Sequence, residues 1–287
     1  DGIEDGGMIE YLTRKKKEGR FPVYQTTERP DRAAQAILEG RVVLLTDNSP
    51  EALIFPATLN SLFQTADDYY RNERIVTFLR LIRYVAAFLA LALPGLYVAA
   101  ATFHPQLLPG NLIRSMAEAR SGVPFPTAAE VLLMELSFEL LREAGLRMPG
   151  PAGNTIGIVG GLIVGQAAVS ANLVSPITVT VAALTALGSF SIPNEELSEV
   201  FRLWKYGILL LGSCFGILGV MLGCFLLLML MAEQESYGIP WLYPYVGGNL
   251  NERADEKDSM FLAAARKRKR RPIFAKWGNR IRFRRKS

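Results

Sequence analysis

The chain has 287 residues, of which 50% are hydrophobic and 21% are charged. This composition is too apolar for an ordinary soluble domain and too polar for a chain that lies wholly in a membrane, so we expect membrane and aqueous parts together. The formal charge of +5 originates in the C-terminal tail, because twelve Lys and Arg residues and no acidic residue lie between Arg266 and Lys286. The rest of the chain is net acidic, which excludes a basic surface along its whole length.

The N-terminal region begins with a polar, charged stretch, which we expect to continue a helix or linker from a missing upstream part. A short strand follows, then a helix opened by Pro30, and then two apolar runs at residues 42–46 and 52–55. Because Asn, Ser and Pro between these two runs favour a turn, they predict a β-hairpin. Residues 1–75 are therefore expected to be the C-terminal part of a small cytosolic α/β domain.

Four uncharged stretches further along the chain approach or exceed the roughly 20 residues that a helix needs to cross a bilayer. They lie at residues 84–103, 154–174, 177–192 and 207–231. Arginines cluster before the first stretch, and the rule that basic residues stay inside places both termini in the cytosol. The acid-rich connection at residues 194–206 is then expected outside, and residues 76–245 form the predicted transmembrane domain.

Glycines at a spacing of four line one face of the second stretch and recur in the fourth. Such faces let neighbouring helices approach closely, although glycine is also simply frequent in membrane helices. Gln166, beside the first set, is expected either to bond a neighbouring helix or to line a pore. The candidate helix-packing residues are Gly157, Gly161, Gly165, Gly212, Gly216, Gly219 and Gly223.

A helix predicted at residues 127–146 carries four glutamates, which make it too charged to face lipid and too apolar for free solution. Glu135 and Glu139 are four residues apart, so they share one helix face, which Arg142 continues. Two interpretations stay open. In one, the two glutamates line a pore and form an acidic ring in an oligomer. In the other, the helix lies at the interface and its glutamates pair with Arg142 and Arg147.

The fold class predicted by these patterns is a mainly α-helical integral membrane protein. It has about four transmembrane helices, an interfacial or pore-lining helix, and part of a small α/β cytosolic domain. Residues 246–287 are expected to be a disordered polybasic cytosolic tail that is attracted to anionic lipid. Aromatic residues interleave with the tail's charges, which permits nucleic-acid binding, but the expected partner is lipid and not nucleic acid.

Catalytic chemistry finds little support in the sequence. The chain has one histidine, no phosphate-binding loop and no spacing of metal ligands, so we expect no enzyme, no cofactor and no metal site. Two rivals to a channel stay open. One is a membrane enzyme that uses Glu135 and Glu139, although Arg142 on the same face would neutralise that pair. The other is a scaffold that assembles partners without conducting ions.

Six blocks of the sequence, in this order, resemble the A subunits of spore germination receptors, the GerA family. They are TERPDRAAQAILEGRVVLLTDNSPEALIFPAT, DDYY, ATFHPQLLP, GVPFPTAAEVLLMELSFELLREAGLRMPGP, GQAAVSANLVSP and SFSIPN. The resemblance covers roughly residues 21–244. It departs at both ends, because most of the larger N-terminal domain of the family is absent and the tail shows no likeness.

The resemblance implies a multi-pass protein of the inner spore membrane that acts with a nutrient-binding B subunit and a lipoprotein C subunit. It further implies a homo-oligomer, with a pentamer as the expected number, that forms a nutrient-gated cation channel and triggers germination. A paralogous branch of the family acts with the machinery that releases dipicolinic acid. The alternative function is therefore a non-conducting scaffold or an accessory subunit of that release.

Overall fold

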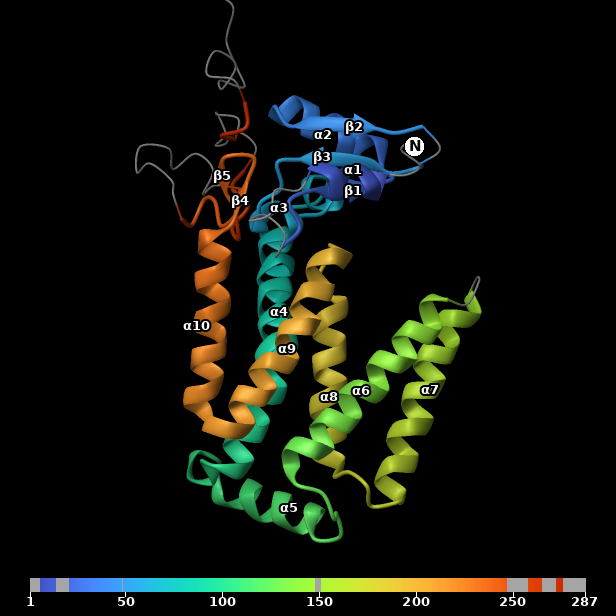
Figure 1. Ribbon diagram of the computed structural model, residues 1–287, viewed down its shortest axis with the longest axis vertical. Helices are drawn as coiled ribbons and strands as arrows, with labels where there is room; N and C mark the ends of the chain where they lie inside the picture. Colours follow the sequence, from blue (N-terminus) through green and yellow to red (C-terminus); the bar gives the residue numbers. More distant parts are fainter. Residues whose placement is uncertain are drawn as a thin grey trace, which may run out of the picture. The chain divides into compact units, whose positions relative to one another are not determined.

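The computed structural model of the chain describes residues 6–13, 21–47, 49–147, 151–246, 258–264 and 272–275, and these are mainly helical (Figure 1). Side chains of residues 151–159 and of Leu162 are outside the described part. The longer helices are α1 (Gly6–Thr13), α2 (Pro30–Glu39), α4 (Glu73–Thr102), α5 (Gly110–Arg120), α6 (Thr127–Leu146), α7 (Pro151–Ser170), α8 (Pro176–Phe190), α9 (Glu195–Phe215) and α10 (Ile217–Glu233). Short helical turns are α3 (Leu59–Leu62), η1 (Ala66–Tyr69) and η2 (Pro105–Leu107).

Two compact units make up the chain. Unit 1 comprises Asp1–Val85, Ile192–Val200 and Leu227–Ser287, and unit 2 comprises Ala86–Ser191 and Phe201–Leu226. The division falls inside α4, α9 and α10, so each of these helices contributes turns to both units. The domain boundaries expected at residues 75 and 245 stay a prediction.

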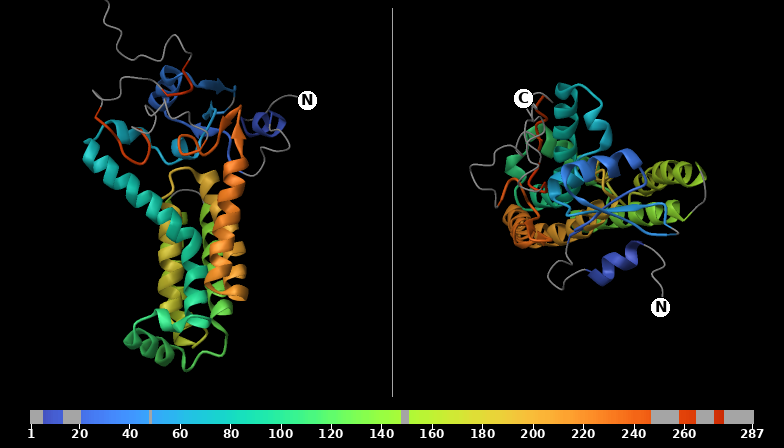
Figure 2. Two further views of the ribbon diagram at one scale, coloured as in Figure 1. Left: turned by 90° about the vertical axis from the view of Figure 1, so that its left-hand side faces the viewer. Right: turned by 90° about the horizontal axis from the view of Figure 1, so that it is seen from above.

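Unit 1 contains the small α/β element expected from the sequence. Strands β1 (Gln25–Thr27), β2 (Val42–Leu45) and β3 (Ala52–Phe55) form an antiparallel sheet in the order β1-β3-β2, against which α2 packs (Figure 2). The predicted hairpin is confirmed as the β2–β3 pair. Pro30 begins α2 and Gly40 ends it with a positive φ of 91°, which a glycine adopts without strain.

A second small sheet in unit 1 belongs to the segment that follows α10. Strands β4 (Glu235–Ser236) and β5 (Ile239–Pro240) pair antiparallel, and Trp241 then enters the core, where it is 0% exposed. The Trp241 indole N–H donates to the Pro22 carbonyl over 2.8 Å, and its ring lies 5.0 Å from that of Phe21. The residues that follow α10, at the end of the predicted transmembrane domain, therefore belong to unit 1.

A buried charge network in unit 1 surrounds Asp68. The Asp68 carboxylate accepts from Arg80 Nε over 3.0 Å and from Arg83 Nη1 over 2.9 Å, and Arg80 Nη1 also donates to Asp258 over 3.0 Å. Burial would raise the pKa of the Asp68 carboxyl, but the two arginines outweigh it and hold that pKa below its ordinary value. Asp258 lies within the predicted polybasic tail, and it belongs to unit 1. The expected disorder of residues 246–287 stays a prediction. The basic residues of the tail lie outside the described part.

The apolar stretches read as membrane spans mostly coincide with helices. Residues 84–103 lie almost wholly within α4, and the second and third stretches correspond to α7 and α8. In the part of the chain that the structure describes, only α4 is both long and apolar enough to cross a membrane, whereas α8 and α10 are shorter apolar helices. One such helix is weak support for a membrane protein, so membrane crossing by the first three stretches stays a prediction.

The fourth predicted span is wrong as a single helix. Residues 207–231 divide into the end of α9 and most of α10, and Gly216 between them has a φ of +62°. This left-handed backbone ends α9 and turns the chain, and glycine tolerates it because it has no Cβ atom. A Cβ at Gly212 would lie 3.0 Å from the Gly95 carbonyl oxygen, and one at Gly223 would lie 2.9 Å from Ile208. These glycines therefore make close contacts within one chain.

Gly219→Ala is expected to destabilise unit 2 by about 1–3 kcal/mol, because the added Cβ would lie 2.0 Å from the backbone oxygen of Leu211. Backbone cannot rotate away as a flexible side chain can. Gly207→Ala on α9 is the matched control, since no atom lies within 4 Å of its added Cβ and alanine favours helix by about 1 kcal/mol. Thermal unfolding in detergent measures both variants. Equal melting temperatures for the two would contradict the close contact.

Candidate functional site

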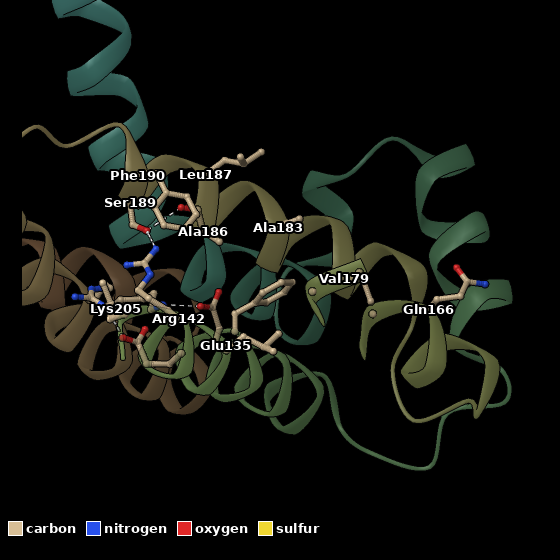
Figure 3. A pocket seen from close by; sticks show the side chains of 18 of the residues that line it. Glu135, Arg142, Gln166, Val179, Ala183, Ala186, Leu187, Ser189, Phe190 and Lys205 are labelled. Carbon is tan, nitrogen blue, oxygen red and sulfur yellow. Dashed lines mark hydrogen bonds and ion pairs between the residues drawn. The ribbon is translucent and has the colours of Figure 1, made fainter. Parts of the chain in front are cut away.

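A cavity of about 810 Å³ lies in unit 2, with walls from α6, α7, α8 and α9 (Figure 3). Helix α6 packs on both α7 and α8, which brings its glutamate face to the inside of this group. Most lining residues are apolar or glycine. The polar and charged ones are Glu135, Glu139, Arg142, Gln166, Ser189, Arg202 and Lys205.

Glu135 forms a buried ion pair with Lys205. The Lys205 ammonium lies 2.5 Å from the Glu135 carboxylate, and the two side chains are 6% and 2% exposed. Because both charges are out of water, each depends on the other for its stabilisation. Glu135 lines the cavity as a neutralised group and not as a free negative charge.

Glu139 lies one helical turn after Glu135 on α6 and forms an ion pair with Arg202. Arg202 lies one turn before Lys205 on α9. The Glu139 side chain is 36% exposed, so the cavity reaches it more readily than it reaches Glu135. Tyr206 adds a hydrogen bond from its hydroxyl to the Glu135 backbone carbonyl over 3.5 Å. Helix α9 therefore supplies the charges that balance the acidic face of α6.

Arg142 has a different partner from the one expected. Its guanidinium donates to the Ser189 hydroxyl over 2.6 Å and lies 4.2 Å over the Phe190 ring, both at the end of α8. Arg147 pairs with Glu143 at 2.6 Å on the exposed side of α6, as the interfacial interpretation expected. The prediction that Arg142 pairs with the glutamates of its own helix is wrong, because α9 already occupies them.

Gln166 and the glycines of α7 lie on the opposite side of the cavity. Gln166 is exposed, and Figure 3 shows it far from Arg142 and Lys205. A Cβ at Gly161 would lie 3.2 Å from the Phe138 ring, and one at Gly165 would lie 3.3 Å from Val179. The surroundings of Gly157 lie outside the described residues. These contacts to α6 and α8 are within one chain.

Comparison with known families decides the identity. The model for the Bacillus/Clostridium GerA spore germination protein family matches residues 1–274. The chain belongs to the GerA family. The match extends past residue 244 to the segment that contains Asp258, so the interpretation that the tail lies outside the family was too narrow.

Several curated relatives resemble this GerA-family chain. Spore germination protein A1 of Bacillus subtilis (strain 168) is 41% identical over 244 residues, which cover 85% of this chain and 51% of that protein. Uncharacterized membrane protein YfkQ of the same strain is 41% identical over 264 residues, with coverages of 92% and 51%. Spore germination protein GerLA of Bacillus cereus is 40% identical over 244 residues, with coverages of 85% and 50%. The chain spans about half the length of these relatives, and no solved structure matches it.

The cavity is lined by the two glutamates that the sequence singles out, and their role in a pore stays a prediction. The sequence does not identify the cations that pair with them. The sequence predicts a short acid-rich connection at residues 194–206, whereas α9 begins at Glu195 and continues as a helix that contributes to the cavity wall. Arg202 and Lys205 are three residues apart and so share one face of α9. This spacing is similar to that of Glu135 and Glu139, which are four residues apart on α6. The two spacings together are the signal in the sequence that α6 and α9 face each other.

Proposed function

We propose that this chain is part of a spore germination receptor A subunit that acts in the inner spore membrane as a homo-oligomeric, nutrient-gated cation channel. The observation that carries the proposal is the pair Glu135 and Glu139, set in one wall of a largely apolar cavity. Carboxylates in such surroundings serve ion pathways because they attract cations and repel anions. The family supports a role in germination, and one relative is described as a membrane protein.

If the chain forms the proposed channel, we infer that the two ion pairs hold it closed. With Lys205 on Glu135 and Arg202 on Glu139, neither carboxylate offers an unbalanced negative charge to a permeating ion. Conduction then requires α9 to move relative to α6, so that the carboxylates are released. A nutrient-binding B subunit and a lipoprotein C subunit are the proposed partners for that signal, and a pentamer is the proposed oligomer.

The double variant Glu135→Gln, Glu139→Gln is expected to lower the ratio of cation to anion permeability, because it removes both carboxylates and leaves the cations Arg142, Arg202 and Lys205 along the cavity. Glutamine keeps the size and hydrogen bonding of glutamate but removes its charge. Ion flux is measured on the full-length protein, reconstituted in lipid with its partner subunits. Glu143→Gln is the matched control, because Glu143 lies on the same helix but pairs with exposed Arg147 outside the cavity. Unchanged selectivity in an intact double-variant oligomer would refute the acidic pathway.

A non-conducting role is the second candidate, and the same ion pairs favour it. If Lys205 and Arg202 neutralise the two carboxylates permanently, the ion pairs hold α6 and α9 together and the cavity conducts no ions. In that case the chain is a scaffold, or an accessory subunit that assists dipicolinic acid release. Absence of flux from a fully assembled complex that still triggers germination would favour this candidate over the channel.

A further inference from the structure

The cavity in unit 2 holds one positive charge in excess. Its lining includes the three cations Arg142, Arg202 and Lys205 and the two carboxylates Glu135 and Glu139. Arg202 and Lys205 are each paired with one carboxylate. Among the described residues, no carboxylate lies within ion-pair distance of Arg142, whose contacts are Ser189 and the Phe190 ring. The cavity is therefore complementary to a single negative charge.

Arg142 is held in an orientation that leaves donors for an anion. A guanidinium carries five N–H donors in one plane, and the guanidinium carbon of Arg142 lies 4.2 Å over the Phe190 ring. The recorded hydrogen bond to Ser189 uses Nη2. The remaining edge can bind a phosphate through two parallel hydrogen bonds, the geometry in which arginine binds oxyanions most strongly.

Between the charged residues at one end and Gln166 at the other, the cavity is lined mainly by apolar side chains and glycines. Figure 3 shows Arg142, Ser189 and Phe190 on one side of the view and Val179 and Gln166 on the other, with Ala183 between them. Val179 and Phe190 are both on α8, and a rise of about 1.5 Å per residue separates them by roughly 16 Å along the helix axis. A ligand that fills this space has a charged head and a long apolar body.

The rim of the cavity distinguishes a lipid from a water-soluble anion. Leu146, Leu187 and Phe190 line the cavity and are also 69%, 62% and 67% exposed. Large exposed apolar side chains around an opening favour contact with acyl chains and not with water. A dissolved anion would have to cross this rim, whereas a lipid would enter along it.

We propose that the cavity of unit 2 is a binding site for one anionic phospholipid, with its phosphate on Arg142 and an acyl chain along α8 toward Val179. This site goes beyond conduction, since it requires a membrane setting but no ion pathway. It is also separate from the basic tail, which attracts anionic lipid only at a surface. The lipid would fill the space among α6, α7 and α8 and so stabilise unit 2.

The test measures which lipids stay bound to the purified full-length protein. The protein is incorporated in vesicles with equal amounts of phosphatidylglycerol and phosphatidylcholine, extracted in mild detergent and washed at about 0.5 M salt, which screens solvent-exposed charges. Native mass spectrometry then counts the retained lipids. We expect at least a fivefold excess of bound phosphatidylglycerol in the wild type, and a loss of this excess in Arg142→Gln.

Three further variants keep the result decisive if Arg142→Gln folds poorly. Arg142→Lys keeps the charge but loses the two parallel hydrogen bonds, so it should keep only part of the preference. Arg147→Gln, which alters an exposed arginine outside the cavity, should leave the preference unchanged. Ala183→Leu narrows the cavity and should reduce retention of both lipids.

Equal retention of the two lipids in the wild type would overturn the proposal, as would an unchanged preference in a folded Arg142→Gln protein. Displacement of bound lipid by palmitate at equimolar amounts would also overturn it, since the ligand would then be a free fatty acid. Ion flux is not part of this readout, so its outcome is independent of the channel proposal.

Discussion

Glu130→Ala is expected to destabilise unit 2 by about 3–5 kcal/mol, because it removes a fully buried carboxylate from its ion pair and hydrogen bonds. The Glu130 side chain is 0% exposed and pairs with Arg120 Nε at 3.1 Å. Its other carboxylate oxygen accepts from the Ser175 backbone N–H over 2.9 Å and from the Thr178 hydroxyl over 3.0 Å. One carboxylate thus joins the end of α5, the first turn of α6 and the first turn of α8.

The physical cost of the substitution has three parts. Alanine leaves a small cavity, removes the partner of Arg120, and leaves the Ser175 N–H unsatisfied at the start of α8. A negative charge at the N-termini of two helices is also favoured by their dipoles. Because every hydrogen bond of this carboxylate connects different helices, its loss should affect the packing of unit 2 and not one local turn.

Two variants control for nonspecific effects at this position. Glu130→Gln keeps the side-chain length and one carbonyl acceptor, so we expect an intermediate loss. Glu118→Ala removes the exposed partner of Arg114 on α5, where the side chains are 68% and 84% exposed, and such pairs contribute less than about 1 kcal/mol. Thermal unfolding of the full chain in detergent, followed by circular dichroism, measures all three. A melting temperature for Glu130→Ala equal to that of Glu118→Ala would contradict the importance of this cluster.

The elements of this fold that were predicted correctly are those with local signals. Pro30 at the start of α2 and the turn residues between β2 and β3 act within a few residues, so the hairpin could be read directly. The turn at Gly216 could not, because the apolar residues on both sides of it are equivalent by composition. Hydropathy measures how apolar a stretch is, and it does not detect the one position at which the chain reverses.

The cations that pair with Glu135 and Glu139 could not be predicted from the sequence, because their positions depend on tertiary packing. Glu135 and Glu139 are neighbours on one helix, and spacing alone identified them. Lys205 lies 70 residues from Glu135 along the chain, and no periodicity within either segment links the two. Arg142 is the nearest cation in sequence and is a partner of the glutamates in one of the two interpretations, although the fold directs it to Ser189. Short-range spacing therefore identifies which residues share a face, and only the packed structure identifies what that face meets.

Lys205→Met is the second substitution for which we expect a large effect, a destabilisation of about 3–5 kcal/mol. It leaves the Glu135 carboxylate buried without its counter-charge, and the side chain is only 2% exposed. Methionine is similar in length to the aliphatic part of lysine, so the loss reports the missing charge more than missing volume. Glu135→Gln alone leaves the Lys205 ammonium buried and should cost a comparable amount.

The double variant Lys205→Met, Glu135→Gln separates the pair from the individual charges. Replacement of both members of a buried ion pair by neutral groups is often neutral or stabilising, so most of the stability should return. The equivalent cycle on Arg202 and Glu139 should show a smaller coupling, because these side chains are 15% and 36% exposed. If the Lys205–Glu135 double variant is as unstable as the sum of its single variants, the buried pair is not coupled and the proposed closed state loses its basis. If the double variant regains stability, the same protein tests whether the pair gates a channel. A channel held closed by this pair should conduct ions without a nutrient signal once the pair is removed. A scaffold should conduct no ions in either form.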